Sequence, residues 1–82
     1  MGTVTLIIQD TCVRITPMER TQLVLMGMPF VAVTKKDVSV EVPGSIHGAF
    51  RRAKDAGILC DELNTMYNAE GAFIVVNLED IR

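Results

Sequence analysis

Alternating apolar and polar positions predict strands near both ends of the chain. In the segment 3–9, β-branched and other apolar residues recur with a period of two, which is typical of a half-buried strand. Asp10 can turn the chain before residues 12–15 extend again, so we predict a first strand that can continue as a hairpin. The nearly continuous apolar run 72–77 predicts a central strand covered by helices.

The residues from Thr16 carry the signals of a helix start. Thr16 takes the N-cap position, Pro17 the first helical position, and Glu19 the position from which its side chain can bond back to the cap amide. Gly27 is placed to end the helix in the left-handed conformation, so we predict a helix over 16–26. The predicted inner face of this helix consists of Met18, Thr21, Val24 and Leu25.

Valines at alternate positions predict two extended segments in the middle of the chain. Residues 30–34 and 37–42 follow this pattern, and Lys35 and Lys36 lie between them. We therefore predict a hairpin with the two lysines at its tip. Pro43 and Gly44 break the second segment.

Helical periodicity is clearest over 45–56. Four apolar residues recur there at positions i, i+3, i+4 and i+7. These residues are Ile46, Ala49, Phe50 and Ala53. We predict a helix over 45–56 that begins after Ser45 and ends at Gly57, whereas the pattern of 58–68 fits both a short helical turn and a strand.

The order of these elements is strand, helix, strand, strand, helix, strand. It predicts a single α+β domain over 1–82, with an antiparallel or mixed sheet and two helices on one face. The same order is that of a ferredoxin-like βαββαβ arrangement, which is the architecture we expect.

The composition predicts association with a partner. The chain has 82 residues and 49% of them are hydrophobic, which is more apolar side chain than the interior of so small a domain readily holds. No apolar run is long enough to cross a bilayer, so we expect no membrane partner. Because of the apolar excess, we infer that some apolar surface faces another protein. We expect this partner to be a second copy of the chain, which would make a homodimer.

Two cysteines and the polar residues of the N-terminal segment predict a cytoplasmic protein. Cys12 and Cys60 are too few for the disulfide framework of a small secreted domain. The first residues lack the basic region of a signal peptide, and polar side chains interrupt the apolar stretch that follows. We therefore expect a reducing compartment and no secretory leader.

The charges suggest a second function. The net charge is −2, which argues against a protein that lives on nucleic acid. Arg51 and Arg52 nevertheless lie in the predicted helix 45–56, and with the Lys35-Lys36 hairpin they offer a basic patch for phosphates. A nucleic-acid-binding regulator is therefore the alternative prediction.

Candidate catalytic chemistry is sparse. His47 is the only histidine, and its place in the predicted helix indicates a surface position rather than a cleft. Neither Cys12 nor Cys60 lies at a spacing that preorganises a metal site, so we expect no metal, no cofactor and no catalytic residue. A second alternative is an enzyme or ligand-binding domain whose site forms at an oligomer interface from His47, Cys60 or Asp61.

Together these patterns predict a small, non-enzymatic protein-binding module. It would act as an accessory, inhibitor or regulatory protein through an apolar and charged docking surface, and would bind another protein or a second copy of itself. The residues predicted to contact a partner are Met26, Met28, Lys35, Lys36, His47, Arg51 and Arg52.

Overall fold

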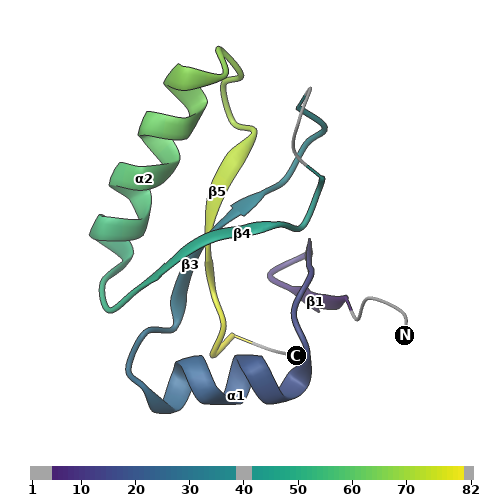
Figure 1. The fold of residues 1–82 in the computed structure, drawn as a ribbon, viewed down its shortest axis with the longest axis vertical. Helices are drawn as coiled ribbons and strands as arrows, with labels where there is room; N and C mark the ends of the chain where they lie inside the picture. The colour runs from purple at the N-terminus through teal and green to yellow at the C-terminus, as the bar shows by residue number, and fades with distance from the viewer. Residues whose placement is uncertain (1–4, 39–41, 81–82) are drawn as a thin grey trace.

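The computed structural model describes residues 5–38 and 42–80, and its described part has the α+β fold that the sequence predicts. Strands and helices follow one another in the order ββαββαβ (Figure 1). The elements are β1 Leu6–Ile8, β2 Thr11–Val13, α1 Pro17–Leu25, β3 Phe30–Thr34, β4 Ile46–Phe50, α2 Ala53–Met66 and β5 Phe73–Asn77.

The described strands form two antiparallel sheets rather than one. β1 and β2 form a hairpin, and the other sheet has the strand order β4-β3-β5. The ferredoxin-like arrangement is therefore not confirmed, since the hairpin pairs with no strand of the larger sheet. The run 72–77 contains β5 as predicted, but β5 is an edge strand; the central strand is β3, whose Val31, Ala32 and Val33 are fully buried.

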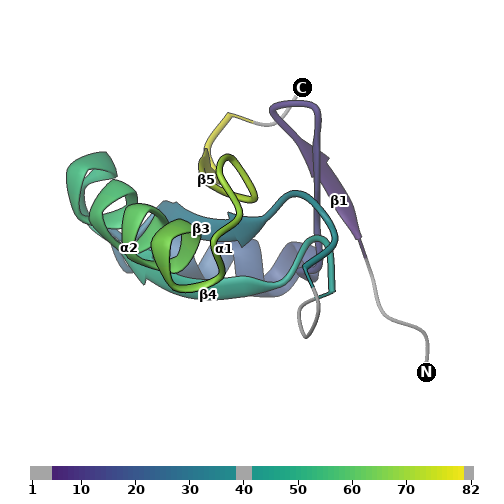
Figure 2. The same ribbon diagram turned by 90° about the horizontal axis from the view of Figure 1, so that it is seen from above.

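Each face of the three-stranded sheet has its own apolar cluster. On one face, Val31 and Val33 of β3 pack with Ile8 and Val13 of the hairpin and with α1, while on the other face Ala32 packs with α2. Figure 2 shows the strands between α2 and the hairpin. The prediction that both helices cover one face is wrong, because α1 packs with the hairpin cluster on the opposite side from α2.

Local signals at both ends of α1 are confirmed. The Thr16 side chain accepts a hydrogen bond from the Glu19 amide, and the Glu19 carboxylate accepts one from the Thr16 amide. At the other end, Gly27 has φ +76°, and the amides of Gly27 and Met28 bond to the carbonyls of Val24 and Leu23. These two bonds form a Schellman motif that stops the helix.

The predicted inner face of α1 is wrong except at Val24. Leu23 and Val24 pack on the hairpin cluster, whereas Met18 and Leu25 are 72% and 81% exposed and Thr21 is also exposed. The reason is that α1 carries two apolar stripes, and periodicity does not say which one meets the core. Arg20 helps to select the observed side, because its Nε donates to the Leu78 carbonyl at 2.8 Å.

The segment predicted as the helix 45–56 is mostly a strand. Residues 46–50 form β4, which pairs with β3, and the register shifts between Ala32 and Val33 so that His47 is an extra residue in the ladder. This β-bulge places Ile46 and Ala49 on the same cluster although they are three residues apart. A bulged strand therefore reproduced the spacing that we interpreted as helical.

Three neighbouring predictions change with it. Gly57 lies inside α2 instead of ending a helix, and the ambiguous segment 58–68 is helical up to Met66. The hairpin partner of β3 is β4 rather than 37–42, of which residues 39–41 lie outside the described residues.

In the part of the chain that the structure describes, no helix has the length and apolar character needed to cross a membrane.

Replacing Thr16 with alanine tests the capping box. The change should destabilise the fold by about 1 kcal/mol near neutral pH, because α1 loses its side-chain cap. Hydrogen bonds from the Thr16 hydroxyl and then the Thr16 amide lower the pKa of Glu19 below its ordinary value. A lowered folded-state pKa gives stability above the unfolded-state pKa that is lost as pH falls through the folded-state value.

The stability difference between wild type and Thr16→Ala should therefore narrow on acidification below the ordinary carboxyl range. Urea unfolding at several pH values measures it. Thr65→Ala, an exposed helix position in α2, is the control and should show a small difference that does not depend on pH. A Thr16→Ala difference that is equally flat would contradict the role of the Glu19 carboxylate.

Candidate interaction surface

The outer side of α1 is the most apolar exposed helix surface in the described structure. Met18 and Leu25 are seven residues apart, so they lie on one side of the helix, and Met26 follows at the C-cap with 58% of its surface exposed. No residue of α1 itself is buried. We call Met18, Leu25 and Met26 the α1 apolar surface.

A groove continues this surface toward the sheet. It encloses about 380 Å³ between α1 and the start of β4, where Leu23, Met26 and Ile46 supply apolar walls. Arg14 and Glu19 also line it, so the groove carries one charge of each sign. An apolar surface beside a groove with balanced charge suits a protein segment better than a phosphate or a metal ion.

The basic residues of the alternative prediction do not come together. Lys35 and Lys36 follow the end of β3, and Arg51 and Arg52 follow the end of β4. Because β3 and β4 are antiparallel, these pairs lie at opposite ends of the two strands, roughly 20 Å apart. All four side chains are exposed, but the structure offers no single basic patch formed by them.

His47 is not on a helix surface, as the sequence predicted, but half-buried in the bulge of β4. Its Nε2 lies 2.7 Å from the hydroxyl oxygen of Thr34, which is fully buried, and its ring meets the edge of Phe73 at 5.2 Å between centroids. Tyr67 stacks on the same Phe73 at 5.4 Å. The bulge therefore turns His47 toward the α2 side of the sheet, where it satisfies a buried hydroxyl.

Cys60 and Asp61, the other residues considered for chemistry, lie on different sides of α2. Burial, and then the charge of Asp61, raise the pKa of the Cys60 thiol, which disfavours the thiolate that a nucleophile needs. Asp61 is exposed on the outer side of α2, while Cys60 faces the sheet. Among residues 5–38 and 42–80, no three His, Cys, Asp or Glu side chains gather closely enough to hold a metal ion.

Met28, predicted to contact a partner, is half-buried in the link between α1 and β3. Its amide belongs to the Schellman motif, so the backbone there is fixed by the helix end. Of the two methionines that the sequence singled out beside Gly27, the structure thus exposes mainly Met26.

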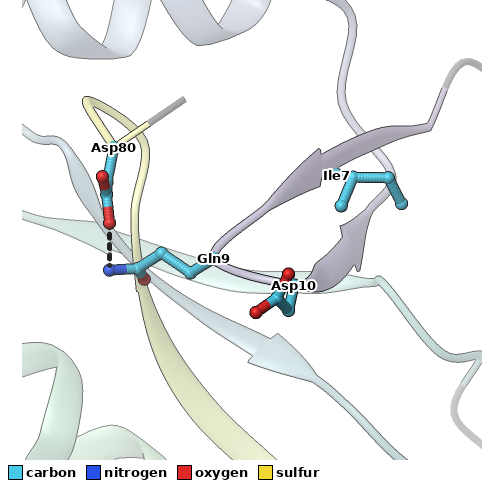
Figure 3. Close-up of a pocket in the computed structure, with 4 residues that line it drawn as sticks. All are labelled: Ile7, Gln9, Asp10 and Asp80. Carbon is cyan, nitrogen blue, oxygen red and sulfur yellow. Dashed lines mark hydrogen bonds between the residues drawn. The ribbon is translucent and has the colours of Figure 1, made fainter. Parts of the chain in front are cut away.

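An open cavity of about 450 Å³ lies between the hairpin tip and the C-terminal turn. Ile7, Gln9, Asp10 and Asp80 line it (Figure 3). The Gln9 side chain spans this junction: its Nε2 donates to Asp80 at 3.0 Å, and its Oε1 accepts from the Asn77 amide at 3.0 Å. Gln9 thus joins the β1-β2 hairpin to the end of β5.

The outer edge of β5 is partly closed by side-chain amides. The amide of Lys35 donates to the carbonyl of Ala72, and the amide of Leu78 donates to the carbonyl of Pro29. The backbone N–H and C=O groups of residues 74 and 76, which lie between these two bonds, therefore point toward β3. The peptide groups of Phe73, Val75 and Asn77 therefore point outward. Asn64 bonds both the amide and the carbonyl of Phe73, and Gln9 bonds the amide of Asn77.

Sequence reasoning missed Met18 and Leu25, which it assigned to the core, and the two amide side chains Asn64 and Gln9. The presence of two apolar stripes on α1 was the available signal for Met18 and Leu25, since a helix with two stripes must expose one of them. Gln9 bonds to Asn77, 68 residues away, and Asn64 bonds to Phe73 across the turn after α2, nine residues away, so neither helix nor strand periodicity marks them.

Comparison with known proteins adds no family. No family model, curated protein or solved structure matches the chain.

Proposed function

We propose that this chain is a small, non-enzymatic protein-binding module that docks through the α1 apolar surface. The observation that carries the proposal is the exposure of Met18, Leu25 and Met26 at 72%, 81% and 58% around one short helix. Fully burying a side chain such as leucine stabilises a protein by roughly 1.5–3 kcal/mol, so contact with a partner would recover free energy that folding leaves unused.

The attachment of α1 suits this role. Its inner side is fixed by the capping box, by the packing of Leu23 and Val24 against the core, and by the bond from Arg20 to Leu78. The outer side is therefore presented on a backbone that is already ordered, and binding does not have to order the helix first. Methionine side chains adapt to the shape of a partner because the thioether is flexible and polarizable.

The experiment compares partner capture by three forms of the tagged chain. The variant Met18→Ser with Leu25→Ser should keep wild-type stability to within about 0.5 kcal/mol, because both side chains are exposed. It should lose the partner that wild type retains, with affinity reduced by about tenfold or more. Binding would be compared by quantitative pull-down and by titration with the purified partner.

Ile58→Ser with Met66→Ser is the matched control. These residues are 49% and 72% exposed on α2, so the control removes a similar amount of exposed apolar surface from another helix. It should bind the partner as wild type does. Equal binding by all three forms would remove the α1 apolar surface from consideration.

A further inference from the structure

The two edges of the three-stranded sheet differ in a way that points to self-association. At the β5 edge, Asn64 and Gln9 occupy hydrogen-bonding positions on both sides of Val75. A strand that added to β5 would have to displace both side chains. Natural sheets protect exposed edges against pairing with other chains, and this edge has such protection.

The β4 edge has one of the usual forms of protection, the bulge at His47, which lies two residues before Ala49. The amide of Thr34 donates to the carbonyl of Ser45, so alternate residues of β3, namely 30, 32 and 34, direct their backbone groups toward β4. Gly48 and Phe50 are paired with Ala32 and Phe30. The N–H and C=O groups of Ala49, which lies between them, therefore point away from β3. No described residue pairs with them. β4 contains neither a charged residue nor a proline, and it forms the margin of the sheet opposite β5 (Figure 2).

We propose that β4 pairs antiparallel with β4 of a second copy of this chain, with Ala49 opposite Ala49. The pairing gives two hydrogen bonds that are related by the two-fold axis, each from one Ala49 amide to the other Ala49 carbonyl. It also places Phe50 of each copy opposite Gly48 of the other, so the two Phe50 side chains are not directly opposed. This inference rests on the proposed protein-binding role but uses a different surface.

Charge selects the antiparallel orientation. Arg51 follows β4 directly, so a parallel pair in register would bring the Arg51 side chains of the two copies to adjacent strands, about 5 Å apart. In the antiparallel pair centred on Ala49 they are about 14 Å apart, which exceeds the screening length of roughly 8 Å at physiological ionic strength.

A second copy is favoured over an unrelated strand because pairing between two copies leaves no unprotected β4 edge on which further chains could add. Two sheets of order β4-β3-β5 would join into one sheet whose outer strands are both β5. Both remaining edges would then carry Asn64 and Gln9, so assembly stops at two copies. A strand pair this short buries less than the roughly 1,200 Å² of a stable interface, so the dimer should be in equilibrium with monomer.

Sedimentation of the full chain from low micromolar to near-millimolar concentration tests the proposal. Wild type should shift reversibly toward twice its 9.0 kDa mass. Ala49→Pro removes the outward amide without removing a bond to β3, and should raise the dimer dissociation constant by about tenfold or more. Val75→Pro makes the same change at the β5 edge and should dimerise as wild type does; circular dichroism checks that each variant is folded.

Amide hydrogen exchange of the wild type keeps the test independent of the variants. The Ala49 amide should exchange more slowly at high than at low concentration, whereas the Val75 amide should not change. A mass of one copy throughout, with Ala49 exchange unaffected, would overturn the inference. A dimer that survives Ala49→Pro but is lost in Met18→Ser with Leu25→Ser would also overturn it, while supporting the proposed function of α1.

Discussion

Replacing Gly44 with alanine is expected to destabilise the fold more than any other single substitution considered. Gly44 has φ +90°, and an added Cβ would lie 2.9 Å from both Arg14 Cγ and the Cys12 carbonyl oxygen. Backbone strain of about 1 kcal/mol and overpacking of about 2 kcal/mol together predict a loss of roughly 3 kcal/mol. For a chain of this size, the melting temperature should fall by roughly 15 °C.

The reason for this sensitivity is the position of Gly44 between three segments. Its amide donates to the Thr34 carbonyl at 2.6 Å, and its carbonyl accepts from the Arg14 amide at 2.9 Å. The turn thereby joins the end of β3 and the residue after β2 to the start of β4. Any shift that relieves the contact with Cys12 and Arg14 also disturbs these bonds.

Gly27→Ala is the matched control for Gly44→Ala. Gly27 has a similarly positive φ of +76°, but an added Cβ would meet nothing within 4 Å. It should therefore lose only the strain contribution of about 1 kcal/mol. Thermal unfolding followed by circular dichroism measures both. Equal losses in the two variants would show that the close approach of Gly44 to the hairpin segment does not matter.

Replacing Asn64 with alanine is the second large effect we expect. The Asn64 side chain accepts from the Phe73 amide at 3.0 Å and donates to the Phe73 carbonyl at 3.2 Å, in a partly buried site. Losing both bonds leaves two backbone groups of β5 unpaired, which costs about 2 kcal/mol, or a drop in melting temperature of roughly 10 °C. Urea and thermal unfolding measure the change.

Asn64→Ala should also change association, because it opens the protected β5 edge beside Phe73. Light scattering at high concentration should detect species larger than those of wild type. Thr65→Ala, the next residue on α2 and exposed, is the control and should differ from wild type by no more than about 0.5 kcal/mol. A variant Asn64→Ala as stable and as small as Thr65→Ala would contradict the capping role of Asn64.

Local signals in the sequence predicted the elements that local chemistry determines. Thr16, Pro17, Glu19 and Gly27 fixed the helix α1 at both ends, because caps involve residues only a few positions apart. The apolar run around Phe73–Asn77 likewise predicted β5. The coarse α+β class followed from these elements and is confirmed.

The remainder depended on contacts between distant segments. The bulge at His47 turned a strand into a helix-like pattern, and its cause is the pairing of β4 with β3. The side of α1 that meets the core depends on the packing of Leu23 and Val24 with the hairpin and on Arg20 reaching Leu78, 58 residues away. Sequence periodicity contains neither fact, so it could not predict the edge position of β5 or which of the two apolar stripes of α1 is exposed.

The candidate surface was predicted only in part for the same reason. Met26 was named because it adjoins the helix end, and the structure exposes it. The basic pairs were grouped by their predicted hairpin and helix, but antiparallel pairing of β3 with β4 separates Lys35 from Arg51. Their contribution to partner binding stays a prediction.

Methionine oxidation footprinting tests the docking role of α1 most directly. Met18 and Met66 are both 72% exposed, on α1 and α2 respectively, and Met26 is 58% exposed, so free protein should be oxidised at all three. In the complex captured with the tagged wild-type chain, Met18 and Met26 should be protected while Met66 reacts as before. Unchanged oxidation of Met18 and Met26, with or without protection of Met66, would contradict the proposal that this protein binds its partner through α1.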